Sequence, residues 1–147
     1  MNIKVIYHSK TGNTKKIAEA IAESIGASVE PISKNIKVDT LDILFIGGGV
    51  YFGRADSTTE TFIKKLSAEN VKNAVVFGTF GGMNKAILSM KDLLRKQGIN
   101  VIDRSFGCKG AVLLLLNLVN RKHPNEEDLE AAKEFAIGVV QDIKNTK

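Results

Sequence analysis

The chain has little of several features that would place it in a special class of protein. Its one cysteine, Cys108, cannot form a disulfide within the chain. Its most apolar run, Ala111 to Leu116, is far shorter than the roughly 20 residues that a membrane span requires. The N-terminus has no signal-peptide pattern, and no basic stripe with interleaved aromatic residues is present. These absences predict a cytoplasmic protein with no membrane span and no nucleic-acid partner.

The remaining composition is that of an ordinary globular domain. The chain has 147 residues, of which 44% are hydrophobic and 25% are charged. We expect one domain over residues 1–147, as a monomer or weak homodimer, because no linker or internal repeat is visible. The apolar segment 111–119 is expected to cover the core, with a contact surface for a partner or a second copy as the alternative.

Short apolar runs alternate with helical patterns along the chain. Nearly continuous apolar runs predict central parallel strands at Ile3 to Tyr7, Leu41 to Ile46 and Ala74 to Phe77. More polar runs predict edge strands at Ala27 to Ile32 and Ile99 to Phe106. Apolar residues at helical spacing predict four helices between and after them, around Ile17 to Ile25, Phe62 to Leu66, Ile87 to Leu94 and Leu129 to Ile143. This alternation predicts an α/β fold, a doubly wound five-stranded sheet with helices on both faces.

A loop rich in hydroxyl groups lies between the first strand and the first helix. Helix N-termini present free N–H groups and a dipole that favours anions, so this loop predicts a phosphate site. A simple helix cap by Thr11 or Asn13 is the alternative, although one cap needs only one side chain. The loop lacks the spacing of a Walker A motif and of a dinucleotide-binding fingerprint. It consists of Ser9, Lys10, Thr11, Gly12, Asn13 and Thr14.

Two more unusual loops are expected at the same edge of the sheet. Glycines let a backbone approach a ligand closely, and aromatic side chains offer flat apolar surface. Glycines that serve turns or helix packing, and aromatic residues Tyr51, Phe52 and Phe80 that fill the core, are the alternatives. Together the three loops predict a site for a planar ring that carries a phosphate. The second loop runs from Gly47 to Gly53 and the third from Gly78 to Gly82.

These residues resemble those of the flavodoxin family over essentially the whole chain. The phosphate loop of that family reads Thr/Ser-x-Thr-Gly-x-Thr and is matched here by Ser9, Thr11, Gly12 and Thr14. The resemblance implies a short-chain flavodoxin-like fold with strand order 2-1-3-4-5 and flavin mononucleotide (FMN) beyond the carboxyl ends of the strands, as in the flavodoxin case from which that site rule is known.

The resemblance also implies roles for the two later loops. In the second loop, Tyr51 or Phe52 would cover the flavin ring and the carbonyl of Gly53 would accept the N5 hydrogen of the reduced ring. Gly49 and Val50 belong to the same expected cofactor site. Four residues of the third loop would lie against the edge of the ring: Thr79, Phe80, Gly81 and Gly82. No catalytic residue and no metal ligand are expected.

The function implied by the resemblance is single-electron transfer between a reductase and an acceptor protein. The isoelectric point of about 9.3 departs from the acidic flavodoxins and favours partners with acidic docking surfaces. Gly81-Gly82-Met83 stands where the family carries an outer stacking aromatic, so the alternative is an FMN-dependent reductase or a redox partner subunit. Bases around the loops outnumber Asp56, which predicts an easier second reduction step than in acidic flavodoxins. These bases are Lys10, Lys15, Arg54, Lys85 and Lys109.

Three further side chains invite a chemical role. Cys108 beside Lys109 is expected to be an ordinary buried thiol, with a redox thiol as the alternative. His8 is expected to be an exposed bystander of the phosphate loop, with a charge-shielding role as the alternative. His123 is expected to be a turn residue at the start of the last helix.

Overall fold

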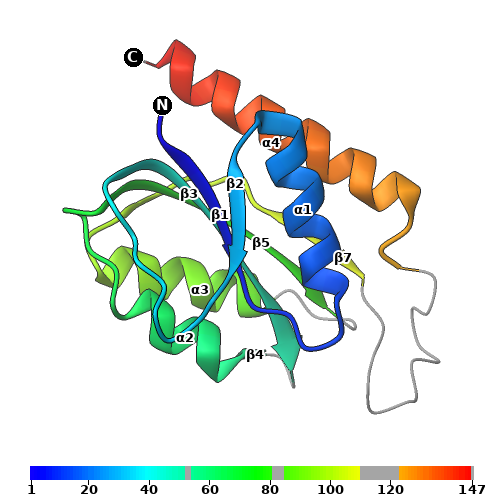
Figure 1. The fold of residues 1–147 in the computed structure, drawn as a ribbon, viewed down its shortest axis with the longest axis horizontal. Coiled ribbons are helices and arrows are strands. Elements are labelled where there is room, and N and C mark those ends of the chain that lie inside the picture. Colours follow the sequence, from blue (N-terminus) through cyan, green and yellow to red (C-terminus); the bar gives the residue numbers. More distant parts are fainter. Residues whose placement is uncertain (52–53, 81–84, 110–122, 147) are drawn as a thin grey trace.

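The computed structural model describes residues 1–51, 54–80, 85–109 and 123–146. Strands and helices alternate along the chain, and a central sheet lies between two pairs of helices (Figure 1). The helices are α1 (Asn13–Ile25), α2 (Ser57–Ile63), α3 (Lys85–Lys96) and α4 (Glu126–Asn145). The strands are β1 (Ile3–Tyr7), β2 (Ser28–Pro31), β3 (Leu41–Tyr51), β4 (Arg54–Ala55), β5 (Val71–Phe80), β6 (Asn100–Val101) and β7 (Phe106–Lys109).

The sheet has the order predicted from the sequence. Its main path runs β2-β1-β3-β5-β6 with parallel neighbours, which is the doubly wound order expected for a flavodoxin-like fold. The fifth position is divided between β6 and β7, which both pair with β5. Asp103 and Arg104 interrupt it and are exposed. A polar pair of this kind disfavours a continuous strand.

Each face of the sheet is covered by its own hydrophobic core. On one face, Ile6, Leu44 and Val76 pack with residues of α2 and α3. On the other face, Val5 and Phe45 pack with residues of α1 and α4 (Figure 1). Alternate residues of one strand thus serve opposite cores, which explains why these strands read as unbroken apolar runs.

The last helix, α4, begins at a reciprocal capping box. The side chain of Asn125 accepts a hydrogen bond from the N–H of Asp128, and the Asp128 carboxylate accepts one from the N–H of Asn125. His123 Nδ1 also lies 2.6 Å from Asp128 Oδ2. The turn residue is therefore attached to the helix N-terminus.

Two strands are longer than the apolar runs predict. β3 continues through Gly47, Gly48 and Gly49 to Tyr51, and β5 continues through Gly78 to Phe80. The glycine segments expected as loops are therefore largely strand. The short strand β4 was not predicted; it pairs antiparallel with the end of β3. In the described ranges, no helix combines the length and the apolar character needed to cross a membrane.

Candidate functional site

The candidate site lies at the carboxyl edge of the sheet, where the ends of β1, β3, β5 and β7 lie side by side. Tyr7 at the end of β1 is in register with Gly47 of β3. Gly49 of β3 is in register with Thr79 of β5, and Thr79 in turn with Cys108 of β7. In a doubly wound sheet this edge is where ligands bind.

The loop after β1 leaves the first turn of α1 without a side-chain cap. The N-cap residue is Gly12, with φ of 87°, in the left-handed region that glycine adopts without strain. Its own N–H donates to Ser9 Oγ at 3.0 Å. The alternative in which Thr11 or Asn13 caps this helix is therefore wrong. The first turn also contains no acidic residue, so the partial positive charge of the helix N-terminus is not offset there.

A hydroxyl pair joins this loop to the end of β5. Thr14 Oγ1 and Thr79 Oγ1 lie 2.9 Å apart and are hydrogen bonded. Both residues are buried, as is Asn13 beside them. Two sequence-predicted site residues that are 65 positions apart are thus in direct contact. The contact fixes the position of the α1 N-terminus relative to the central strands.

The glycines of β3 and β5 have a packing role. A Cβ at Gly47 would lie 2.1 Å from Cε2 of Phe77, and a Cβ at Gly48 would lie 2.7 Å from Oγ1 of Thr59. A Cβ at Gly78 would lie 2.8 Å from the carbonyl oxygen of Gly48. Side chains at these positions would collide with the ring of Phe77, with Thr59 of α2 or with the backbone of the neighbouring strand. The helix-packing alternative is therefore correct at Gly48, whose neighbour Thr59 belongs to α2, whereas Gly47 and Gly78 are in close contact with a neighbouring strand.

A β-hairpin forms at the end of β3. Val50 pairs with Ala55, and Tyr51 pairs with Arg54. On β5, Phe80 is in register with Lys109. The structure thus places the backbone of Val50, Tyr51 and Phe80 at the same edge as Thr79. The remaining predicted site residues, Phe52, Gly53, Gly81 and Gly82, lie outside the described residues, as does segment 111–119.

Asp56 and His8 form a buried polar contact that the sequence did not reveal. Asp56 Oδ1 lies 2.8 Å from His8 Nδ1, and the side chain of Asp56 is 2% exposed. The two atoms are close enough for an ion pair but are not aligned as a hydrogen bond, and Nδ1 has no other partner. His8 is therefore not the exposed bystander that we expected. Its contact links the start of the phosphate loop to the residue that follows β4.

Asp56 also holds the first turn of α2. Its Oδ1 accepts the N–H of Thr59 at 2.9 Å, and its Oδ2 accepts the hydroxyl of Thr59 at 2.8 Å. These bonds satisfy a carboxylate that would otherwise be costly to bury. The sequence does carry a signal for this role of Asp56, because aspartate is a preferred N-cap residue before a helical pattern.

The thiol of Cys108 is protected rather than activated. Burial, with a smaller contribution from the charge of Asp128, raises the pKa of Cys108 to about 12. A thiol with this pKa is protonated at neutral pH and is a poor nucleophile. Cys108 is therefore the ordinary buried thiol that we expected.

The donor set at this edge fits a phosphate group. It combines an uncapped helix N-terminus, small hydroxyl side chains and a left-handed glycine that gives the ligand close access to the backbone. Lys10 and Lys15 are exposed beside it. The fold and this arrangement define a class: doubly wound α/β proteins with an uncapped helix N-terminus and hydroxyl side chains at the carboxyl edge of the sheet, where such folds bind ligands.

Comparison with known proteins identifies the family within that class. The model of the flavodoxin domain matches residues 4–123. The chain is 32% identical to an uncharacterized protein of Methanocaldococcus jannaschii, over 94% of this chain and 95% of that protein. It is 31% identical to a flavodoxin of Clostridium beijerinckii, over 69% of this chain and 81% of the relative.

Solved structures give the same fold. A flavodoxin from the domain Archaea superposes with a TM-score of 0.79 at 24% identity, over 98% of this chain and 99% of that structure. The protein belongs to the flavodoxin family. This family consists of flavin-binding electron-transfer proteins, so the resemblance stated from the phosphate loop is confirmed.

Proposed function

We propose that the protein is an FMN-binding electron carrier that passes single electrons from a reductase to an acceptor protein. The observation that carries this proposal is the uncapped N-terminus of α1, with Gly12 as N-cap, at the carboxyl edge of the sheet. An anionic group there would be held by oriented N–H groups. Bound FMN would supply the electron chemistry, and the chain would supply position and electrostatics.

The phosphate would be held by the loop from Ser9 to Thr14. The N–H groups of Asn13 and Thr14 are at the helix start, and the hydroxyls of Ser9 and Thr11 lie in the same loop. Gly12 allows the chain to turn into the helix because glycine takes the left-handed conformation without strain. In this proposal the Thr14–Thr79 hydrogen bond sets the distance between the phosphate and the ring.

The ring would lie against the ends of β3 and β5. We assign its contacts to the hairpin end of β3 and to the segment from Thr79 onward, in keeping with their position beside the phosphate loop. The residues concerned are Gly49, Val50, Tyr51, Phe52, Gly53, Thr79, Phe80, Gly81 and Gly82.

The protein partners are proposed to carry acidic docking surfaces. Lys10, Lys15, Lys16 and Lys85 are all exposed and flank the carboxyl edge of the sheet through the loop after β1 and the start of α3. The formal net charge of the chain is +5. Opposite charge on a partner would speed encounter and favour one orientation.

The test compares FMN with riboflavin, which has the same ring and no phosphate. We expect the purified protein to bind FMN about a hundredfold more tightly than riboflavin, because charge-assisted hydrogen bonds to phosphate are the strong ones. Thr14→Val should weaken FMN binding, whereas Thr40→Val, an exposed threonine far from this edge, should not. Equal affinity for FMN and riboflavin would overturn the assignment of the phosphate to this loop. Failure to bind either ligand would overturn the proposal that the protein binds FMN.

A further inference from the structure

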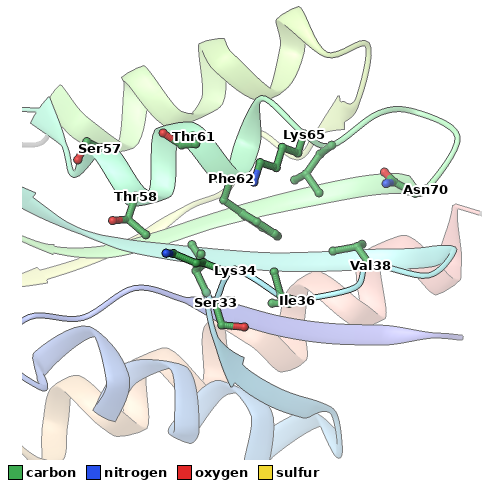
Figure 2. A pocket seen from close by; sticks show the side chains of 12 residues that line it. Ser33, Lys34, Ile36, Val38, Ser57, Thr58, Thr61, Phe62, Lys65 and Asn70 are labelled. Carbon is green, nitrogen blue, oxygen red and sulfur yellow. The ribbon is translucent and has the colours of Figure 1, made fainter.

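A pocket of about 580 Å³ lies between α2 and segment 32–40, which connects β2 to β3. Figure 2 shows its two walls, with side chains from α2 on one side and from the connecting segment on the other. None of the residues expected to bind the cofactor lines it. We call it the α2 pocket.

The base of the α2 pocket is apolar. Phe62 is 5% exposed and Leu66 is 3% exposed, and both belong to the core on that face of the sheet. From the connecting segment, Ile36 and Val38 are half-buried and pack against the same core. In Figure 2 the ring of Phe62 points from α2 toward Ile36. The interior therefore suits a ring or a short apolar chain.

The rim of the α2 pocket is polar and positively charged. Ser57, Thr58 and Thr61 line the α2 wall. Lys34 contributes an ammonium group from the connecting segment and Lys65 one from the turn after α2. No carboxylate lines this pocket, and neither lysine has an ion-pair partner among the residues that the structure describes. Two unpaired positive charges above an apolar base complement an anionic head on an apolar body.

We infer that the α2 pocket binds a small amphipathic organic anion, a carboxylate or sulfonate attached to a ring or short chain. Its volume falls within the roughly 300–1,000 Å³ of small-molecule sites. A bare inorganic anion would leave the apolar base in water. A second copy of this chain, packed with this pocket on the two-fold axis, would bring the lysines of both copies together, and no carboxylate lines the pocket to offset them. The site is independent of the proposed flavin site.

The experiment uses three probes that share a naphthalene ring and carry an anionic, a neutral or a cationic head group. They are 1-naphthoate, 1-naphthalenemethanol and 1-naphthylmethylammonium, each titrated into the full-length protein and followed by amide chemical shifts. We expect naphthoate to bind about tenfold more tightly than the alcohol, because its carboxylate gains charge-assisted hydrogen bonds, and the cation to bind more weakly than either. The shifted amides should fall in 33–38 and 57–66.

Paired substitutions test the lysines. The double variant Lys34→Gln and Lys65→Gln should lower naphthoate affinity to that of the alcohol. A matched double variant, Lys37→Gln and Lys64→Gln, removes the same charge from exposed neighbours that do not line the pocket, and it should keep the affinity. Thr61→Trp, at an exposed position on the α2 wall, should fill the pocket and abolish binding of all three probes.

Several results would overturn the inference. Equal affinity for the three probes, or an equal loss in the two double variants, would remove the role of Lys34 and Lys65. Shifts confined to residues 9–14 would move binding to the phosphate loop. Absence of saturable naphthoate binding would contradict a small-molecule site. Binding of a glutamate-rich peptide in place of naphthoate would make this surface a protein-docking site.

Discussion

At the scale of single residues, the contact between His8 and Asp56 matters most. Asp56 is almost completely buried and serves three groups at once: the N–H and hydroxyl of Thr59 and the ring of His8. Burial of a carboxylate is costly unless its oxygens accept hydrogen bonds or lie beside a positive charge. The residue therefore connects the phosphate loop, the hairpin and α2 through one side chain.

Substitution of Asp56 should be costly. Asp56→Ala removes an N-cap and leaves His8 and the Thr59 hydroxyl without their partner, so we expect a loss of about 2–4 kcal/mol in the free energy of unfolding. Asp39→Ala, at an exposed position, is the control and should change it by less than about 0.5 kcal/mol. Urea denaturation measures both. A loss below about 1 kcal/mol for Asp56→Ala would contradict this account.

The same substitution at two glycines should have opposite effects. Gly47→Ala would place a methyl group 2.1 Å from the Phe77 ring, inside a packed core, and should destabilise the fold. Gly138→Ala lies in α4, where the nearest atom is Arg104 Nη2 at 3.0 Å at the end of a flexible side chain. There we expect a gain of about 0.5–1 kcal/mol from helix propensity. Thermal unfolding of the two variants checks the signs; the same sign in both would refute the packing argument.

At the scale of elements, β7 and the start of α4 together set the chemistry of Cys108. The thiol is buried on β7, and the charge of Asp128 in the first turn of α4 adds to the rise in its pKa. Raising the pKa of a thiol favours its protonated form in the folded state. The folded protein then resists ionisation that the unfolded chain undergoes freely.

Alkylation of Cys108 should reveal this protection. At pH 8.5 we expect iodoacetamide to react at least about tenfold more slowly with the folded protein than with the chain in urea, because the reactive species is the thiolate. The sign for stability follows from the same shift. The pKa rises from 9.0 to about 12, so stability falls as pH increases from about 9 toward 12, and Cys108→Ala should remove that part of the loss. Equal alkylation rates would contradict the burial argument.

At the scale of the whole molecule, positive charge distinguishes this protein from acidic flavodoxins. Its net charge is +5, and exposed lysines flank the carboxyl edge of the sheet. Basic groups near a flavin favour the negatively charged, fully reduced form. The same charges would draw partners with acidic surfaces.

The charge predicts the redox behaviour of the FMN-loaded protein. The second one-electron reduction should have a higher potential than in acidic flavodoxins. Added salt should raise this potential less than it raises the potential of an acidic flavodoxin. A spectroelectrochemical titration at low and high ionic strength measures this. A second potential as low as in acidic flavodoxins would refute the electrostatic argument.

Much of the fold could be predicted because the patterns that specify it involve residues close together in the sequence. The apolar run of β1, the hydroxyl-rich loop and the spacing of Ile17 and Ile21 follow one another within one segment of chain. The capping box at Asn125 is equally local. These features depend on neighbours along the chain and therefore survive in a single sequence.

The features that were missed depend on contacts between distant residues. His8 meets Asp56 only because β1 and the β4–α2 junction end at the same edge. Gly47 and Gly78 read as loop residues, although their lack of a side chain serves core packing and strand contact. The interruption between β6 and β7 was visible only as the polarity of Asp103 and Arg104.

The most direct test of the central proposal is the response of the phosphate-loop amides to FMN and to riboflavin. In ¹H–¹⁵N spectra of the purified protein, we expect large shifts for the N–H groups of Gly12, Asn13 and Thr14 with FMN and small ones with riboflavin. Binding of FMN that leaves these amides unchanged, or the same shifts with both ligands, would contradict a phosphate site at the N-terminus of α1.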